Sequence, residues 1–406
     1  MKILLVNKFF YQKGGAETVY FQERKMLREE GFDIVEFSMR DEQNFASDYS
    51  QFFVNNVDYN KSSGVIAKLK TATKFIHNAE ACDKFRQLLE KERPDVVHFH
   101  NIYHQLTPSI IKIAKQFACA TVLTAHDYKI ACPNYTMYRD GVVCDKCVKG
   151  SNLNAFSQRC QEGSAVKSLL LSIEAIYQSV AKNYQQLDAI VSPSEFLSDV
   201  IKRKLPQVRM EVIVNGIDET IAEGEIEDEG YFVFFGRLSN EKGVPTLLKA
   251  HEKMRNKSTL KIVGTGEMYD ELVSQYSNAE FCGFQSGNAL EDLIKKARAV
   301  VVPSEWYENC SMSVLEAMAY GKPVIGSQIG GIPEQIRDGV DGLLFEACDV
   351  DNLTEKLDFF AENPHIAQEM GRNARQRLID KYSLTKHKES LIHLYKELLN
   401  NKSINN

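Results

Sequence analysis

The sequence predicts an α/β protein made of two doubly wound parallel-sheet domains that face each other across a cleft. Three observations carry this prediction. At 406 residues the chain is too long for one ordinary core, which favours two domains. Short β-branched runs alternate with helix-length segments, a pattern typical of parallel sheets covered on both faces. The pattern occurs twice, and two such domains place a ligand site where their strand ends meet.

The expected elements follow in chain order. Strands are expected at residues 2–6, 33–37, 94–100, 120–126, 188–194, 211–215, 231–237, 260–266, 279–284, 299–304 and 323–327. Helix-length patterns lie between them, and an amphipathic helix is expected at 383–399. The acidic stretch 217–230 is interpreted as the hinge region. The expected division is an N-terminal domain of 1–215, a C-terminal domain of 216–380, and a terminal helix of 381–406 that packs back on the first domain.

Composition and charge exclude several classes of protein. The chain is 44% hydrophobic and 26% charged, as in ordinary globular proteins. Met1 is followed at once by an apolar strand, and no run of about 18 apolar residues occurs, so neither a cleavable leader nor a spanning helix is expected. Residues 1–215 hold 28 Lys and Arg against 24 Asp and Glu, and the remainder holds 21 against 31. The cationic half predicts an anionic surface or substrate, whereas the scattered basic residues do not favour nucleic acid. We expect a cytoplasmic location, either free or peripheral at the inner face of the cell membrane.

Two cations follow the strand expected at 231–237. Arg237 and Lys242 lie in the Gly-bounded loop GRLSNEKG, where a guanidinium fork and an ammonium group suit a diphosphate. Two solvated surface cations are the alternative interpretation. Gly264 and Gly266 follow the next strand, but the third glycine of a dinucleotide fingerprint is absent. These glycines therefore indicate only a close approach of two backbones.

The stretch ENCSMSVLE places Glu308 and Glu316 eight positions apart. If both were helical, they would be separated by ~12 Å of rise and about 80° of rotation. The helix is expected to begin between Asn309 and Ser311, where its free amides favour an anionic group. The two carboxylates then suit two polar arms of an elongated ligand. Two exposed helix glutamates are the alternative, and spacing alone does not decide between them.

Polar residues also follow strands of the first half. Gly14 and Gly15 allow a tight loop after the first strand, and Glu17 suits the start of the next helix. His126 and Asp127 are expected to face the cleft, although a histidine at a strand end is more often structural. No metal site is assigned to the three histidines of VHFHNIYH, which are His98, His100 and His104.

Together these motifs resemble those of the family 4 glycosyltransferases, retaining enzymes of the GT-B fold. The segments GGAE, HD, NGID, GRLSNEKG, VGTGEMYDEL, PSEWYENCSMSVLEAMAYGKPVI, GGIPE and DGVDGLLF match the family pattern in order over nearly the whole chain. The most specific part is 303–325, which holds the E-x7-E motif. Many relatives have Phe-Gly after the first glutamate, where this chain has Asn309 and Cys310. The small Cys310 side chain is expected to preserve the amide site but to alter the pocket against the sugar.

The resemblance implies roles for the matching residues. Arg237 and Lys242 would hold the diphosphate, and Glu316 would bind the ribose hydroxyls. Glu308 would bind the donor sugar, which His126 would contact from across the cleft. The implied catalytic residues are Glu308, His126, Arg237 and Lys242. The implied donor-binding residues are Gly15, Arg237, Lys242, Gly264, Phe284, Cys310, Ser311, Met312 and Glu316, with Gly264 and Phe284 at the nucleobase.

The implied reaction is the retaining transfer of a hexose from a UDP- or GDP-sugar to a glycan or lipid-linked oligosaccharide, for cell-surface polysaccharide. Fixed cations and helix amides would stabilise the leaving group, so no cofactor is expected to be required for catalysis. Front-face attack and double displacement through Glu308 both stay open. The alternatives are a GT-B enzyme of other chemistry, such as a phosphorylase or a sugar-nucleotide epimerase, and a non-catalytic nucleotide-sugar-binding protein. The charged cleft residues favour the transferase.

Four of the nine cysteines cluster in a polar insertion at about 130–163 of the N-terminal, acceptor-binding domain. Cys132, Cys144, Cys147 and Cys160 form C-x11-C-x2-C-x12-C. A disulfide framework is not expected in a cytoplasmic chain, and the C-x2-C core is typical of structural zinc sites. Four free thiols, or bridges formed on oxidation, are the alternatives because the outer spacings are loose.

Residues 61–78 form a basic amphipathic segment that carries Lys61, Lys68, Lys70 and Lys74. Such a segment suits an anionic membrane surface, at about 1 kcal/mol for each well-placed lysine. A solvated helix flanking the acceptor cleft is the equally open alternative.

Overall fold

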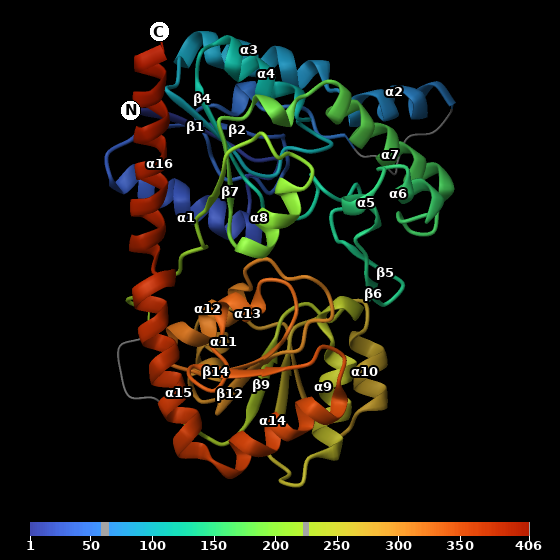
Figure 1. The fold of residues 1–406 in the computed structure, drawn as a ribbon, viewed down its shortest axis with the longest axis vertical. Helices are drawn as coiled ribbons and strands as arrows, with labels where there is room; N and C mark the ends of the chain where they lie inside the picture. The colour runs from blue at the N-terminus through green and yellow to red at the C-terminus, as the bar shows by residue number, and fades with distance from the viewer. Residues whose placement is uncertain (58–64, 222–226, 406) are drawn as a thin grey trace.

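The first domain is built on a parallel sheet of six strands in the order β2-β1-β3-β4-β7-β8. The computed structural model describes residues 1–57, 65–221 and 227–405 (Figure 1). The strands are β1 (Lys2–Val6), β2 (Asp33–Phe37), β3 (Val96–Phe99), β4 (Ala120–Thr124), β7 (Ala189–Ser192) and β8 (Met210–Val212). Val6 is in register with both Phe37 and Phe99, so neighbouring strands end at the same edge. The residues that follow these strands therefore meet at the cleft.

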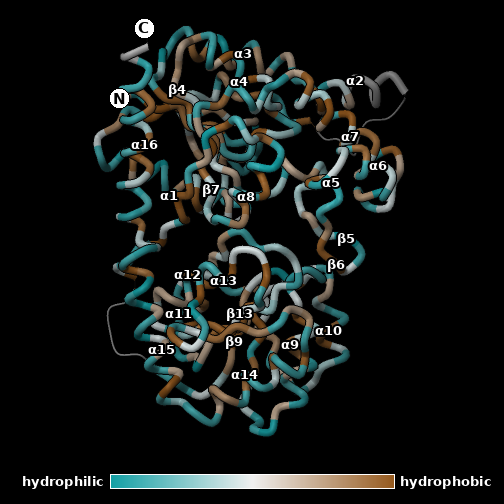
Figure 2. The backbone as a smooth tube through the Cα atoms, viewed as in Figure 1, coloured by the Kyte–Doolittle hydropathy of each residue, from teal (hydrophilic) through white to brown (hydrophobic). Residues whose placement is uncertain are grey.

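The second domain repeats the design with the order β11-β10-β9-β12-β13-β14. Its strands are β9 (Phe232–Phe235), β10 (Leu260–Val263), β11 (Glu280–Gly283), β12 (Ala299–Val302), β13 (Val324–Ser327) and β14 (Gly342–Phe345), all in parallel pairs. Strands β9, β12 and β13 are buried along their whole length, because helices cover both faces of the sheet. Figure 2 shows apolar strands at the centre of each domain. The predicted fold class is confirmed.

Three strands were not predicted. β14 is an edge strand with only three apolar residues between Gly342 and the following acidic stretch, which is too short a pattern to stand out. β5 (Tyr138–Arg139) and β6 (Val142–Val143) form a small antiparallel hairpin within the Cys-rich insertion. The other eleven strands lie within the predicted ranges or within one residue of them.

Helices cover both sheets. The helices of the first domain are α1 (Gly15–Glu29), α2 (Val65–Ile76), α3 (Ala79–Glu92), α4 (Ser109–Gln116), α5 (Lys146–Lys149), α6 (Asn154–Ser157), α7 (Ala165–Val180) and α8 (Glu195–Lys202). Those of the second are α9 (Val244–Lys253), α10 (Tyr269–Gln275), α11 (Asn288–Lys295), α12 (Met312–Ala319), α13 (Ile332–Gln335), α14 (Val350–Glu362) and α15 (Pro364–Arg377). Among the described residues, none of these helices has the length and apolar content needed to cross a membrane.

The last helix, α16 (Leu384–Asn405), leaves the second domain and runs along the first (Figure 1). Leu391, Leu394 and Tyr395 pack in one buried cluster with residues of β1. The guanidinium of Arg209 donates to both carboxylate oxygens of Glu397, at 2.7 and 2.8 Å. At the hinge, a Cβ on Gly216 would lie 2.8 Å from the Cα of Leu384, so this position admits no side chain. Residues 216–217 and the start of α16 are therefore packed directly together, and residues 222–226 of the predicted hinge lie outside the described residues.

Candidate active site

A cleft of about 260 Å³ lies between the two domains. It is lined from the first domain by Gly15, His126 and Tyr135, and from the second by Lys242 and the segment 306–313. All of these follow strand ends or start helices, as expected for a site at the carboxyl edge of doubly wound sheets.

Lys242 and Glu308 form an ion pair in this cleft. The Nζ atom of Lys242 lies 2.6 Å from Oε1 of Glu308, which also accepts from Ser304 Oγ at 2.8 Å and Trp306 Nε1 at 2.9 Å. Burial alone would raise the pKa of Glu308, but the charge and hydrogen bond of Lys242 hold it below its ordinary value. The carboxylate is therefore ionised. Its Oε1 atom is saturated, which leaves Oε2 for a ligand.

The loop that carries Lys242 requires a glycine. Gly243 has a φ of +68°, and a Cβ there would lie 1.9 Å from the carbonyl oxygen of Pro303. The two loops therefore touch backbone to backbone, which brings Lys242 against Glu308. Arg237 does not join this pair: its side chain is 69% exposed, 3.9 Å from Glu241, and it does not line the cleft. Burial and the charge of Asp127 raise the pKa of Tyr135, and the Arg237 guanidinium opposes that rise.

The helix after Glu308 begins later than predicted. Met312 is the first residue of α12 and Ser311 is its N-cap, so Glu308 lies in the preceding loop. The condition that both glutamates are helical is therefore not met, because only Glu316 lies in the helix. The amide of Ser311 donates to Oε1 of Gln335 at 2.8 Å and is not free for a ligand. The amide of Met312 has no acceptor within the helix, as at any helix start.

Gly331 holds the loop 308–311 in place. Gly331 donates its amide to the carbonyl of Glu308 at 2.6 Å, and a Cβ on Gly331 would lie 1.8 Å from the carbonyl oxygen of Asn309. Asn309 in turn donates from Nδ2 to the carbonyl oxygen of His126 at 2.7 Å, across the cleft. The Cys310 thiol is half-buried and accepts hydrogen bonds from the backbone of Asn215 and, at 3.5 Å, from Nε2 of Gln335. These contacts indicate a packing role.

The remaining predicted residues lie around this centre. Gly15 starts α1, and its side-chain position is 3.8 Å from Cγ of Met312, so the two helix starts nearly touch. A Cβ on Gly264 would lie 1.9 Å from the carbonyl oxygen of Gly236, which is the close backbone approach that the sequence indicated. Phe284 is 71% exposed. Burial raises the pKa of Glu316 to about 7, and no described residue donates a hydrogen bond to its carboxylate.

A series of buried polar side chains connects His126 to α16. Nε2 of His126 lies 2.9 Å from Nδ1 of His100, whose Nε2 lies 3.4 Å from Oε2 of Glu23. Oε1 of Glu23 lies 3.1 Å from Nε2 of His387 on α16. The carboxylate favours a proton on Nε2 of His100, so Nδ1 of His100 accepts from Nε2–H of His126. Burial lowers the pKa of His126 to about 3, which leaves a neutral ring with Nδ1 as its acceptor.

Glu23, His98 and His100 present ligand atoms within 4.8 Å of one another and so resemble a metal site. Both nitrogens of His98 are already used, because Nε2 lies 2.7 Å from the Thr124 hydroxyl and Nδ1 lies 2.6 Å from the Tyr395 hydroxyl. We therefore assign the group as a hydrogen-bonded network. Sequence reasoning missed Glu23, although it lies on the apolar stripe of α1, where a charge is unusual.

In the first domain, Asp127 anchors a second polar group. Its carboxylate accepts from the Tyr103 hydroxyl at 2.5 Å and from the Lys129 amide at 2.9 Å. The Nζ atom of Lys8 lies 3.8 Å from the centre of the Tyr103 ring, and burial lowers the pKa of Lys8 to about 8. The sequence indicated Asp127 but gave no signal for Tyr103 or Lys8, which come from other strand ends.

Contacts across the cleft hold the domains together. The carboxylate of Glu334 accepts from the amides of Glu195 and Phe196 at 2.8 and 2.7 Å, so a residue of α13 caps helix α8 of the other domain. The rings of Phe196 and Tyr307 are 4.8 Å apart, centre to centre.

Two doubly wound sheets with a charged cleft at their facing edges define a GT-B glycosyltransferase. The chain belongs to Glycosyltransferase Family 4, whose model matches residues 13–220, and the model Glycosyl transferases group 1 matches 217–377. It is 23% identical to an uncharacterized glycosyltransferase of Methanocaldococcus jannaschii over 98% of this chain and 99% of that one. It is 27% identical to the lipopolysaccharide 1,2-N-acetylglucosaminetransferase of Salmonella typhimurium over 48% of this chain and 58% of that one. In structure it is similar to sucrose-phosphate synthase of Thermosynechococcus elongatus, with a TM-score of 0.74 and 18% identity over 98% and 99% of the chains.

Proposed function

We propose that this glycosyltransferase moves a hexose, with retention of anomeric configuration, from a UDP- or GDP-sugar to a glycan or lipid-linked oligosaccharide acceptor. The observation that carries the proposal is the Lys242–Glu308 pair beside the start of α12. A cation, free helix amides and an ionised carboxylate are thereby held within one cleft. This combination suits a diphosphate bound next to sugar hydroxyls.

On the donor side, Lys242 and the amides near Cys310 and Met312 would bind the diphosphate. The glycine at position 15 leaves room for the phosphates between the two helix starts. Arg237 would turn from solvent toward a second phosphate oxygen, since moving a long exposed side chain breaks few contacts. Glu316 would accept from the ribose hydroxyls. Gly264 and Phe284 would flank the nucleobase.

The chemical step builds negative charge on the leaving phosphate while the sugar becomes oxocarbenium-like. Lys242 and the helix amides would stabilise that charge, so we propose that catalysis needs no metal or other cofactor. The neutral His126 and the free oxygen of Glu308 would orient the sugar from opposite domains. On the side of Asp127, the leaving phosphate oxygen would take the proton of the acceptor hydroxyl. A structure of the similar Anabaena protein HepE holds UDP-glucose, which supports a nucleotide-sugar donor.

Thermal-shift measurements with UDP- and GDP-sugars, followed by NMR of the product, test this proposal. We expect stabilisation by one diphosphate-sugar and a product with the anomeric configuration of the donor. Stabilisation only by ligands without a diphosphate would exclude the donor assignment. An inverted product would exclude retention.

We also propose that the enzyme works at the inner face of the cell membrane in cell-surface polysaccharide synthesis. The name of the similar Salmonella typhimurium enzyme, a lipopolysaccharide 1,2-N-acetylglucosaminetransferase, supports a role in such synthesis. The predicted basic segment contains α2, where Lys74 lies 3.6 Å from Glu80 and is partly neutralised. Lys61 and the side chains of Lys68 and Lys70 lie outside the described residues. Co-sedimentation with vesicles that does not respond to anionic lipid would argue against this location.

A further inference from the structure

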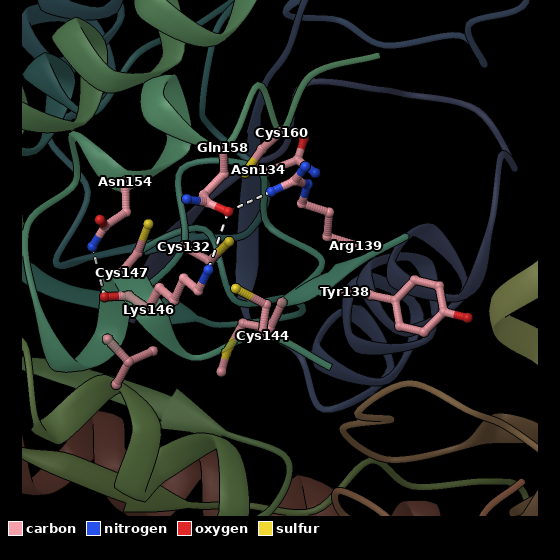
Figure 3. A pocket seen from close by; sticks show the side chains of 12 residues that line it. Cys132, Asn134, Tyr138, Arg139, Cys144, Lys146, Cys147, Asn154, Gln158 and Cys160 are labelled. Atoms are coloured by element: carbon pink, nitrogen blue, oxygen red, sulfur yellow. Dashed lines mark hydrogen bonds between the residues drawn. The ribbon is translucent and has the colours of Figure 1, made fainter. Parts of the chain in front are cut away.

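The Cys-rich insertion brings four thiols to one place. Cys132 follows the loop after β4, Cys144 follows the β5–β6 hairpin, Cys147 lies in α5, and Cys160 follows α6. All four line a single cavity of about 20 Å³, and Figure 3 shows them around it. This space is about that of one water-sized sphere, which also suits one metal ion. We propose that these four cysteines bind one zinc ion, and that the ion fixes the wall of the cleft formed by the insertion.

The backbone around the cavity is arranged as in thiolate sites. The amides of Asn134 and Met137 donate to Sγ of Cys132. The amide of Cys144 donates to the carbonyl oxygen of Met137 at 2.7 Å, which ties the hairpin to the first cysteine loop. Amide hydrogen bonds to sulfur orient the ligand for a metal. The four thiols are free of disulfides.

Cations surround the cluster. The side chains of Arg139 and Lys146 both line the cavity and both donate to Oε1 of Gln158, at 2.6 and 3.1 Å. Lys204 is also near Cys147 and donates to the carbonyl oxygen of Gly150 at 2.7 Å. Four thiolates around a divalent ion carry a net charge of about −2. Arg139 is already paired with Asp140, with Nε 2.9 Å from Oδ2, so the cations offset only part of such a charge.

The insertion has little core of its own. Val142, Leu153 and Phe156 are exposed, with Val142 63% accessible, while only a few of its residues, such as Met137 and Val148, are buried. Its buried residues Ala131, Met137 and Val148 belong to the core cluster of the first domain, so the insertion depends on that domain for its packing. A structural zinc ion would stabilise the insertion directly.

The sulfurs are spread more widely than in a loaded site. No three of the four cysteines, all of them described, bring their Sγ atoms within 4.8 Å of one another. Zinc–sulfur bonds of about 2.3 Å would place the sulfurs about 3.8 Å apart. Metal binding therefore requires side-chain rotations that draw the thiols inward. The insertion is then tighter with the metal than without it.

This tightening reaches the cleft. Tyr135, three residues after Cys132, lines the cleft, and its ring stacks on that of Tyr103 at 6.0 Å between centres. The β5–β6 hairpin extends from the first domain toward the second in Figure 1. The metal thus holds the acceptor-facing wall without touching the reacting atoms. Zinc binding does not depend on the proposed donor or acceptor, so it can be tested separately from catalysis.

Metal analysis of protein purified without added metal is the first test. We expect about one zinc per chain, and about none in a Cys144→Ser/Cys147→Ser variant. The control is Cys348→Ser, which removes an exposed cysteine of the second domain and should keep the metal. Chelation should lower the unfolding temperature and open residues 130–163 to proteolysis.

Cobalt binding keeps the proposal testable if the double variant fails to fold. Chelator-treated wild-type protein should take up one Co²⁺ with the absorption of a tetrahedral thiolate site, and Zn²⁺ should displace it. Two disulfides found by mass spectrometry after alkylation without reductant would overturn the proposal. Zinc content near zero with no cobalt spectrum would overturn it as well.

Discussion

Lys242→Ala is the change that bears most directly on the proposed chemistry. It removes the cation 2.6 Å from Glu308 and leaves a buried carboxylate with two neutral donors, Ser304 and Trp306. Breaking a fully buried ion pair by removing one partner costs about 3–5 kcal/mol. Because the Lys242 side chain is 23% exposed, water screens part of this loss, and we expect about 2 kcal/mol. Loss of one preorganised charge at a leaving group costs about 10²–10³ in turnover, or roughly 3–4 kcal/mol.

The two effects separate in matched variants. Denaturant unfolding should show that Lys242→Ala/Glu308→Ala regains the stability lost by Lys242→Ala, while turnover with the identified donor stays low in both. Arg237→Ala should keep wild-type stability because its side chain is 69% exposed, yet lose turnover if it contacts the diphosphate. Lys253→Ala removes an exposed cation paired with Asp351 and should change neither quantity. Near-wild-type turnover by Lys242→Ala would refute the reasoning.

Three further predictions rest on single residues. Burial raises the pKa of Glu316 to about 7, so the enzyme's affinity for the free nucleotide should fall as the pH drops through 7 and the carboxylate is protonated. Calorimetry should show that Glu316→Gln removes this part of the pH dependence. An unchanged pH profile in the variant would contradict the proposed role of Glu316. Glu23 raises the pKa of His387, so the pair stabilises the fold below the ordinary histidine pKa of about 6.5 and loses this effect as pH rises through the raised value. The drop in unfolding temperature caused by Glu23→Gln should therefore shrink at alkaline pH, and a constant drop would exclude the linkage. Gly331→Ala should displace the 308–311 loop and abolish turnover, whereas Gly339→Ala, which meets open space, should cost only about 1–2 kcal/mol of left-handed backbone strain.

Most of the fold could be predicted because parallel strands buried on both faces are continuous apolar runs. The strands at 120–124 and 299–302 are examples, and their ends located His126 and the segment before Glu308. The edge strand β14 and the β5–β6 hairpin were not predicted because neither contains a long apolar run. The helix begins at Met312 rather than at 309–311, and the acceptor of the Ser311 amide is Gln335, 24 residues later, which the local sequence does not show. Glu23 and His387 could not be joined from sequence, since the contact spans 364 residues and depends on how α16 returns to the first domain.

The resting arrangement of the cleft couples two kinds of recognition. Lys242 is neutralised by Glu308 in the free protein, so a bound diphosphate must compete with a carboxylate for the same ammonium group. If the phosphate takes over Lys242, Oε1 of Glu308 would lose its strongest donor and join Oε2 as an acceptor for sugar hydroxyls. A donor with both a diphosphate and a suitably placed hydroxyl satisfies both groups, whereas a nucleoside diphosphate alone leaves Glu308 buried with weaker partners. Under the proposed function, sugar recognition and activation of the leaving group would be linked through one ion pair, and we expect selectivity for the intact donor over its product.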